Sequence, residues 1–172
     1  EYKWDVCGDF KMLGFLLGLQ SGFTKYPCFL CLWDSRDSSN HYVLREWPAR
    51  DDLQPGTYNV KHAALVPVVK ILLPPLHIKL GLIKQFVTAL DRNGETFKEM
   101  RSMFPKLSDA KVTIGVFIGP QVKQMFASET LENRMTELEK RAWSAVKNVV
   151  TGFLDNNKAE NYKDLVEELL DS

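Results

Sequence analysis

The sequence predicts a mostly helical chain of the α+β class, in which one or a few core strands precede a long series of helices. Three observations indicate this fold class. The chain opens on a short alternating segment, and several segments after residue 73 carry apolar residues at helical spacing. Between them, residues 24–62 carry few periodic apolar residues. A length of 172 residues suffices for one domain, or one and a fraction, with a buried core.

Composition and charge narrow the classes of function. The chain is 45% hydrophobic and 26% charged, which is typical of a soluble globular domain. Its 22 basic and 22 acidic residues cancel, so total charge gives no support for tight DNA binding by this segment alone. No run reaches the roughly 18 apolar residues of a membrane span, and we therefore expect no membrane partner. Because the chain opens on Glu1 within a strand-like run, we expect a fragment or a processed piece.

The first elements form a strand followed by a helix. Residues Tyr2–Gly8 alternate loosely and predict a strand, and Phe10–Gln20 predict a helix that is apolar on most faces and therefore buried. Asp9 lies between them, where a carboxylate makes a good helix N-cap. With two further acids Asp9 could hold Mg²⁺, but Asp5 lies about 13 Å away at roughly 3.3 Å per residue, too far to share one ion.

The segment 24–73 is irregular and rich in Cys, His and Trp. An irregular segment longer than about 15 residues needs a reason, such as a metal, a function or disorder, and the aromatic residues here argue against disorder. Cys28 and Cys31 have the Cys-x-x-Cys spacing that lets two thiolates reach one tetrahedral Zn²⁺. Two other interpretations stay open, a pair of inert buried thiols and a redox pair.

The remaining ligands of such a zinc site have few candidates. His41 is close enough in sequence to be the third ligand and His62 could be the fourth, although both could equally be exposed loop histidines. Cys7, on the strand, is most simply a core residue. With three cysteines and no secretory signal, we expect a reducing compartment and a nuclear or cytoplasmic location.

Residues 74–172 predict a helical region. Pro74 and Pro75 suit the first turn of a long helix that ends near Gly94. Further helices are expected over 95–104, 120–126, 136–154 and 159–172, the third of these with a capping box. Residues 108–118 fit either a helix or a strand. The expected organisation is therefore 1–23, 24–73 and 74–172, together in one compact unit.

His77 occupies the first turn of the long predicted helix. Lys79 and Lys84 are nearby, and Lys84 shares the helix face of His77. A histidine with lysines at a helix N-terminus could contact a phosphate, whereas a simple polar residue at a helix start is the commoner case.

Three blocks of the sequence carry a resemblance to a known family. They are GDFKMLGFLLGLQSGFTKYPCFLCLWDSRDSSNHY, LLPPLHIKLGLIKQFV and AENYKDLVEELL, which together cover nearly the whole chain. They resemble uncharacterised transposase-derived proteins of animal genomes. The order of Asp, Cys-x-x-Cys and Leu-His at a helix start is also similar to the catalytic core of DDE recombinases with RNase-H-like folds, including Transib elements and the V(D)J recombinase.

The resemblance implies a role for each of these residues. Asp9 would be the second acid of the DDE triad, and Cys28 with Cys31 would form the first half of a structural zinc site. His77 would lie beside the active site. In that family a His pair completes the zinc site beyond the last helix seen here, the catalytic Glu follows it, and the first Asp precedes residue 1. The parent protein would bind DNA and use Mg²⁺, and the fold would be the end of an RNase-H-like core followed by a helical insertion.

One carboxylate cannot support DDE chemistry, which needs three carboxylates around two metal ions. We therefore expect these 172 residues to be catalytically inactive by themselves. Two alternatives remain. The chain could be a domesticated, non-enzymatic helical module that binds a protein partner or itself, or a small zinc-stabilised binding domain that uses His41 and His62. Nothing in the sequence identifies a small-molecule substrate.

Overall fold

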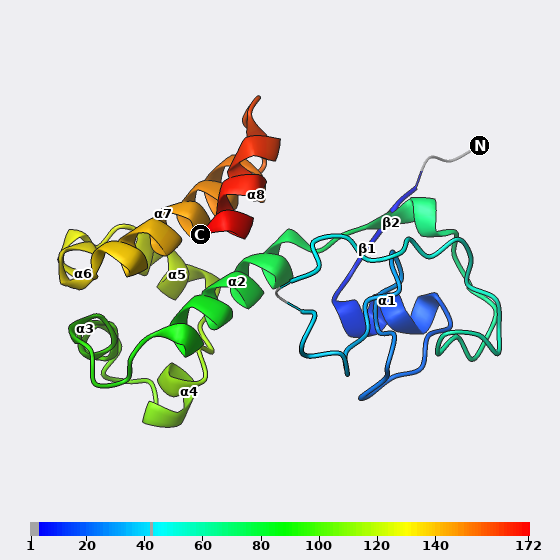
Figure 1. Ribbon diagram of the computed structural model, residues 1–172, viewed down its shortest axis with the longest axis horizontal. Helices are drawn as coiled ribbons and strands as arrows, with labels where there is room; N and C mark the ends of the chain where they lie inside the picture. The colour runs from blue at the N-terminus through cyan, green and yellow to red at the C-terminus, as the bar shows by residue number, and fades with distance from the viewer. Residues whose placement is uncertain (1–3, 42) are drawn as a thin grey trace. The chain divides into compact units, whose positions relative to one another are not determined.

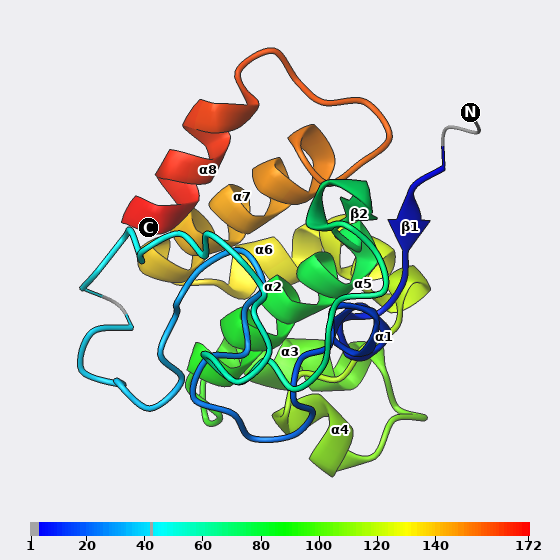
Figure 2. The same cartoon turned by 90° about the vertical axis from the view of Figure 1, so that its right-hand side faces the viewer.

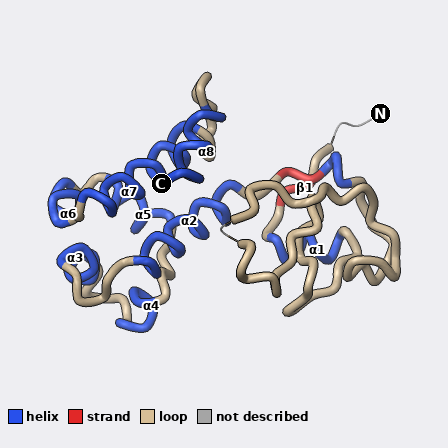
Figure 3. The backbone as a smooth tube through the Cα atoms, viewed as in Figure 1, coloured by secondary structure: helices blue, strands red, loops and turns tan. Residues whose placement is uncertain are grey.

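The computed structural model describes residues 4–41 and 43–172. The chain divides into two compact units, Glu1–Pro74 and Pro75–Ser172. Loops make up most of the first unit and helices most of the second (Figure 3). The prediction of a mostly helical chain with little strand is confirmed.

The first unit is built around a parallel pair of two-residue strands. Strand β1, Val6–Cys7, lies beside β2, Ile71–Leu72, with Val6 opposite Ile71 and Cys7 opposite Leu72 (Figure 1). Helix α1, Phe10–Leu16, follows β1, and a 3-10 turn, Val68–Lys70, precedes β2. The predicted strand is thus shorter than expected, and its residues 2 and 3 lie outside the described part. Strand β2 was not predicted, although the apolar, β-branched run between Pro67 and Pro74 is a signal for a strand.

Helix α1 ends four residues earlier than predicted, and Gly18 is the reason. Gly18 has a φ of +70°, and its N–H donates to Phe15 O while the N–H of Leu19 donates to Gly14 O. These two bonds form a Schellman motif, which ends a helix. A side chain at Gly18 would also place its Cβ 2.0 Å from His62 O, so only glycine fits here.

The expectation that α1 is buried on most faces is wrong. Leu13 and the C-cap residue Leu17 are fully buried and contact Phe29 in a small core. The rest of the helix is largely open, because Phe10, Met12 and Phe15 keep 47%, 51% and 73% of their surface exposed. Among the described residues, the first unit therefore combines a small buried core with several exposed large apolar side chains.

The second unit consists of helices joined by short connections. Helix α2 packs against α5 and α7, α3 packs against α6, and α7 packs along α8 (Figure 2). The predicted helices are present, but α2 ends at Ala89 and Gly94 is instead the N-cap of α3, and α6 was not expected. The ambiguous segment begins as the short helix α4 and continues without a strand. The bounds are α2 Pro75–Ala89, α3 Glu95–Met103, α4 Asp109–Thr113, α5 Gly119–Phe126, α6 Glu129–Arg134, α7 Glu137–Gly152 and α8 Tyr162–Asp171.

Trp143 on α7 lies within the hydrophobic core of the second unit. It is 1% exposed, and its ring lies 4.8 Å from that of Phe86 and 5.0 Å from that of Phe126. Helix α7 starts with the predicted capping box, since Thr136 Oγ1 accepts the N–H of Glu139 and Glu139 Oε2 accepts the N–H of Thr136. None of the helices in the described part is long and apolar enough to cross a membrane.

Candidate functional site

The turn at Cys28 and Cys31 brings two half-buried thiols into contact with each other. The N–H of Leu30 donates to Cys28 Sγ at 3.4 Å, and the N–H of Trp33 hydrogen-bonds the thiol of Cys31. The thiolate is the form of cysteine that binds a metal.

Competing influences act on the pKa of Cys31. Burial and the neighbouring Cys28 thiol raise the pKa of the Cys31 thiol above its ordinary value, while the Trp33 N–H and the positive charge of Arg50 oppose this rise. The net direction is upward, so Cys31 is a protonated thiol at neutral pH. A divalent metal that binds here would have to displace this proton.

His41 lies in the same irregular segment but is held by other partners. Its Nε2 is 2.7 Å from the carbonyl oxygen of Asp34, so this nitrogen carries the proton and donates it. The ring stacks on Trp33 with 4.6 Å between centroids, and the Trp47 ring lies edge-on at 6.4 Å. The Asp34 carboxylate also forms an ion pair with Lys25, with 3.2 Å between Oδ2 and Nζ. His41 therefore helps to hold the loop in shape.

The structure does not bring the predicted zinc ligands together as a set. His62 is exposed, and its backbone N–H donates to Gly18 O at 3.1 Å. Within residues 4–41 and 43–172, no three His, Cys, Asp or Glu side chains form a group that could hold a metal ion. Cys28 and Cys31 together form two of the four positions of a tetrahedral site.

Asp9 lies at the carboxyl end of β1 and is exposed. Its Oδ1 accepts the N–H of Met12 at 2.7 Å, which makes it the N-cap of α1, the structural role that the sequence suggested. An N-cap uses one carboxylate oxygen and leaves a second for another ligand. In open sheets with parallel strands, ligands gather at the carboxyl ends of the strands, where Asp9 lies.

His77 belongs to the second unit, whereas Asp9 belongs to the first. It is exposed in the first turn of α2, as predicted. Lys79 lines an open groove of about 520 Å³ between α2, α5 and the end of α7, with Leu76, Val122 and Lys123 among its other walls. A role for His77 beside an active site stays a prediction.

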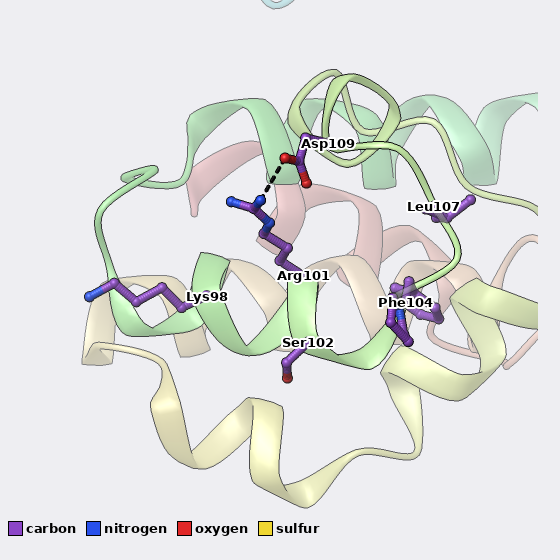
Figure 4. Close-up of a pocket in the computed structure, with 7 residues that line it drawn as sticks. Lys98, Arg101, Ser102, Phe104, Leu107 and Asp109 are labelled. Carbon is purple, nitrogen blue, oxygen red and sulfur yellow. Dashed lines mark hydrogen bonds and ion pairs between the residues drawn. The ribbon is translucent and has the colours of Figure 1, made fainter.

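Another pocket of the second unit lies between α3 and α4 and encloses about 460 Å³. Arg101 points at Asp109 across it and pairs with the carboxylate at 2.5 Å, while Lys98 extends away from the pair (Figure 4). Because Asp109 already neutralises Arg101, this pocket is a poor site for an anion.

Sequence reasoning missed one residue of the Cys28–Cys31 region. Arg50 lies on the strand-like segment that faces the turn, where Cys31 and Ala49 form an antiparallel bridge. The sequence contains no signal for this arginine. Arg50 approaches the cysteine turn only in the folded chain, and no rule of spacing links a loop arginine to a Cys-x-x-Cys pair.

Comparison with known families divides the chain at nearly the same place as the structure. Residues 1–66 match a family described as a domain of unknown function (DUF8703), and residues 75–155 match a second domain of unknown function (DUF8704). The second match begins at the first residue of the second unit. Neither description states an activity. No curated protein and no solved structure matches the chain.

Proposed function

We propose that this chain is part of a DDE-type DNA transposase or recombinase, namely the end of an RNase-H-like core and its helical insertion. The parent reaction would be Mg²⁺-dependent cleavage of a DNA strand followed by strand transfer. The observation that carries the proposal is the position of Asp9, exposed at the carboxyl end of a strand that pairs in parallel with β2. A strand, a helix and a second parallel strand follow one another here, with the acid at the ligand-binding end.

The open apolar surface of the first unit supports the same proposal. Parallel sheets occur almost only where both faces are covered. Here Val6 and Ile71 contact the small core, whereas Cys7 is exposed and Leu72 is 52% exposed. A two-stranded parallel sheet with one open apolar face is what a part of a larger layered core would present.

The Cys28–Cys31 turn would supply two ligands of a structural zinc ion in the complete protein. Two thiols in contact, each near a backbone N–H, match the donor set that Zn²⁺ prefers. The metal would provide a rigid crosslink, and these residues would hold it in place. Asp9 alone would not hold a catalytic metal pair, so we expect the 172 residues to lack strand-cleavage activity.

Two assays on the same preparation test the proposal. Fluorescence anisotropy with a nicked DNA duplex should show binding that weakens at least tenfold between about 50 and 200 mM salt, as about two released counterions require. Incubation of the duplex with Mg²⁺ or Mn²⁺ should leave it uncut. Strand cleavage that persists in the Asp9→Ala variant would refute the assignment of Asp9, and absence of DNA binding would favour a protein-interaction module over a DNA-binding fragment.

A second candidate function is a non-enzymatic protein-interaction module, favoured by the exposed side of α1. Phe10, Met12 and Phe15 are three large apolar side chains that stay exposed on this one short helix, and exposed apolar surface is typical of interaction sites. This function predicts association that strengthens or stays constant as salt rises. Analytical ultracentrifugation of the chain and of Phe15→Ser, at low and high salt, separates it from DNA binding.

A further inference from the structure

Arg50 makes an unusual set of hydrogen bonds for an arginine. Its Nε donates to Cys28 O at 3.0 Å, and Nη2 donates to Tyr26 O at 3.3 Å. Nη1 and Nη2 both donate to Tyr58 O, at 3.3 and 3.2 Å. All these acceptors are backbone carbonyls. No carboxylate of the described residues forms a salt bridge with the guanidinium, so its charge has no acidic partner there.

The backbone of Arg50 holds the same turn from a second direction. Its N–H donates to Leu30 O at 2.9 Å, and the N–H of Leu32 donates to Pro48 O at 2.8 Å. The residue between Leu30 and Leu32 is Cys31, which forms the antiparallel bridge with Ala49. Arg50 thus holds the Cys28 end of the turn with its side chain and the Cys31 end with its main chain.

Tyr58 contributes a third observation. Its φ is +41°, a conformation in which a bulky residue is strained, and the carbonyl of this residue receives two of the guanidinium bonds. The neighbouring Asn59 also has a positive φ, of +69°, and its Oδ1 accepts the N–H of Tyr26 at 2.9 Å. The 58–59 loop is thus bound to the cysteine turn through Arg50 and Asn59.

We propose that Arg50 is a positioning residue that holds Cys28 and Cys31 so that both sulfurs face one thiophilic divalent cation. The proposal rests on the zinc role given to these cysteines above. The guanidinium fixes the carbonyls of Tyr26 and Cys28 at the start of the turn, and its positive charge offsets the negative charge of two thiolates. Residues that orient metal ligands commonly change metal affinity 10–100-fold when they are replaced.

The test uses the full chain with Cys7→Ser, so that Cys28 and Cys31 are the two remaining thiols, and Cd²⁺ alone as the probe. Thiolate-to-cadmium absorbance reports the number of bound sulfurs, and titration gives the affinity. We expect one Cd²⁺ per chain, lost in Cys28→Ser. Arg50→Met should weaken Cd²⁺ binding at least tenfold. Arg50→Lys keeps the charge without the planar fork, so its Cd²⁺ affinity should lie between those of the parent and of Arg50→Met. The control Arg36→Met, on an exposed arginine of the same segment, should bind within about twofold of its parent.

A double variant separates positioning from loop stability. Tyr58→Gly relieves the strained φ and keeps the carbonyl that Arg50 contacts. In Arg50→Met with Tyr58→Gly, a purely structural role predicts that recovered thermal stability also restores Cd²⁺ affinity. A positioning role predicts recovered stability with affinity still at least tenfold weaker.

Each outcome decides the matter. If Arg50→Met binds Cd²⁺ as tightly as its parent, or if Tyr58→Gly restores the Cd²⁺ affinity of Arg50→Met, the proposal for Arg50 is wrong. Either result leaves the zinc role of the cysteines unchanged. Failure of the Cys7→Ser parent itself to bind Cd²⁺ or Zn²⁺ overturns the zinc role, and the proposal for Arg50 with it.

Discussion

The two units of this chain are stabilised by different means. In the second unit, eighteen buried hydrophobic residues form one cluster among the described residues, whereas the corresponding cluster of the first unit contains Leu13, Leu17 and Phe29. The first unit compensates with side chains that bind backbone, such as Arg50, Asn59 and the Ser35 hydroxyl, which donates to Thr24 O at 2.6 Å. Such bonds contribute about 0.5–1.5 kcal/mol each, against about 2–5 kcal/mol for a large core side chain. A segment without apolar periodicity can therefore have a defined shape, and its stability comes from polar contacts.

The sharpest test of this contrast is Trp143→Ala. Its indole is 1% exposed and contacts the rings of Phe86 and Phe126, so removal leaves a large cavity. We expect a loss of about 3–5 kcal/mol in the free energy of unfolding of the second unit. Hydrogen exchange of the full chain measures this as faster exchange in α2, α5 and α7, with the amides of the first unit unchanged.

The matched control lies on the same helix. Leu138 is 64% exposed, and Leu138→Ala should change the free energy of unfolding by no more than about 0.5 kcal/mol. Faster exchange of the first unit in Trp143→Ala would show that the two units unfold together and would remove the basis of the comparison.

A smaller loss is expected for Leu17→Ala in the first unit. Leu17 is fully buried, yet its small cluster can collapse more easily around a cavity, so about 2–3 kcal/mol is expected. Phe15→Ala, on α1 and 73% exposed, is the control and should be close to neutral. Urea unfolding followed by exchange of the α1 amides gives both values. A loss for Phe15→Ala as large as that for Leu17→Ala would mean that the open side of α1 is covered in solution.

The same contrast decides what could be predicted from the sequence. The helices of the second unit were predictable because apolar spacing, a capping box at Thr136 and the Pro74-Pro75 pair are local signals. The end of α1 was misplaced because a run of apolar residues hid the Schellman motif at Gly18. Strand β2 was missed because it has only two residues, and whether so short a segment forms a strand depends on the neighbouring strand more than on its own sequence.

The candidate site was predictable only in part. The spacing of Cys28 and Cys31 identified a pair of sulfurs that the structure holds in contact, and the junction before α1 identified Asp9 as an N-cap. The roles of His41 and Arg50 depend on contacts with Asp34, Trp33 and backbone carbonyls that are distant in sequence or have no spacing rule. Side chains that bind backbone have no periodic signal.

Removal of the α7 N-cap tests how much one local hydrogen bond contributes to the stability of the second unit. Thr136→Ala deletes the hydroxyl that accepts the N–H of Glu139 at 3.3 Å and should cost about 1 kcal/mol. Glu139 keeps a second partner, because Thr96 Oγ1 lies 3.0 Å from its Oε2. Thr136→Ser restores the oxygen and should recover most of the loss in urea unfolding. If Thr136→Ser is as unstable as Thr136→Ala, the methyl group rather than the cap stabilises the helix start.

The smallest effect expected is a pH dependence that compares one carboxylate in each unit. Hydrogen bonds from Asn40 and Ser39, with the charge of His41, lower the pKa of Asp37, and the Lys98 ammonium lowers the pKa of Glu95. Each carboxylate is thus more acidic in the folded chain than in the unfolded chain. Its contribution is present above the unfolded pKa, about 4, and is lost as pH falls through the lower folded pKa.

Asp37→Asn and Glu95→Gln should therefore lower the melting temperature of their own unit at pH 7, by less than Thr136→Ala does, and make no difference once the pH is below the folded pKa of the carboxylate that each replaces. NMR titration of the two carboxyl carbons gives the folded pKa values directly. Because Glu95 depends on an ion pair and Asp37 chiefly on neutral donors, about 1 M salt should move the pKa of Glu95 toward its ordinary value and leave that of Asp37 nearly unchanged. Equal salt sensitivity of the two pKa values would mean that charge also stabilises the loop around Asp37. The first unit would then depend on electrostatic attraction in addition to its neutral hydrogen bonds to backbone.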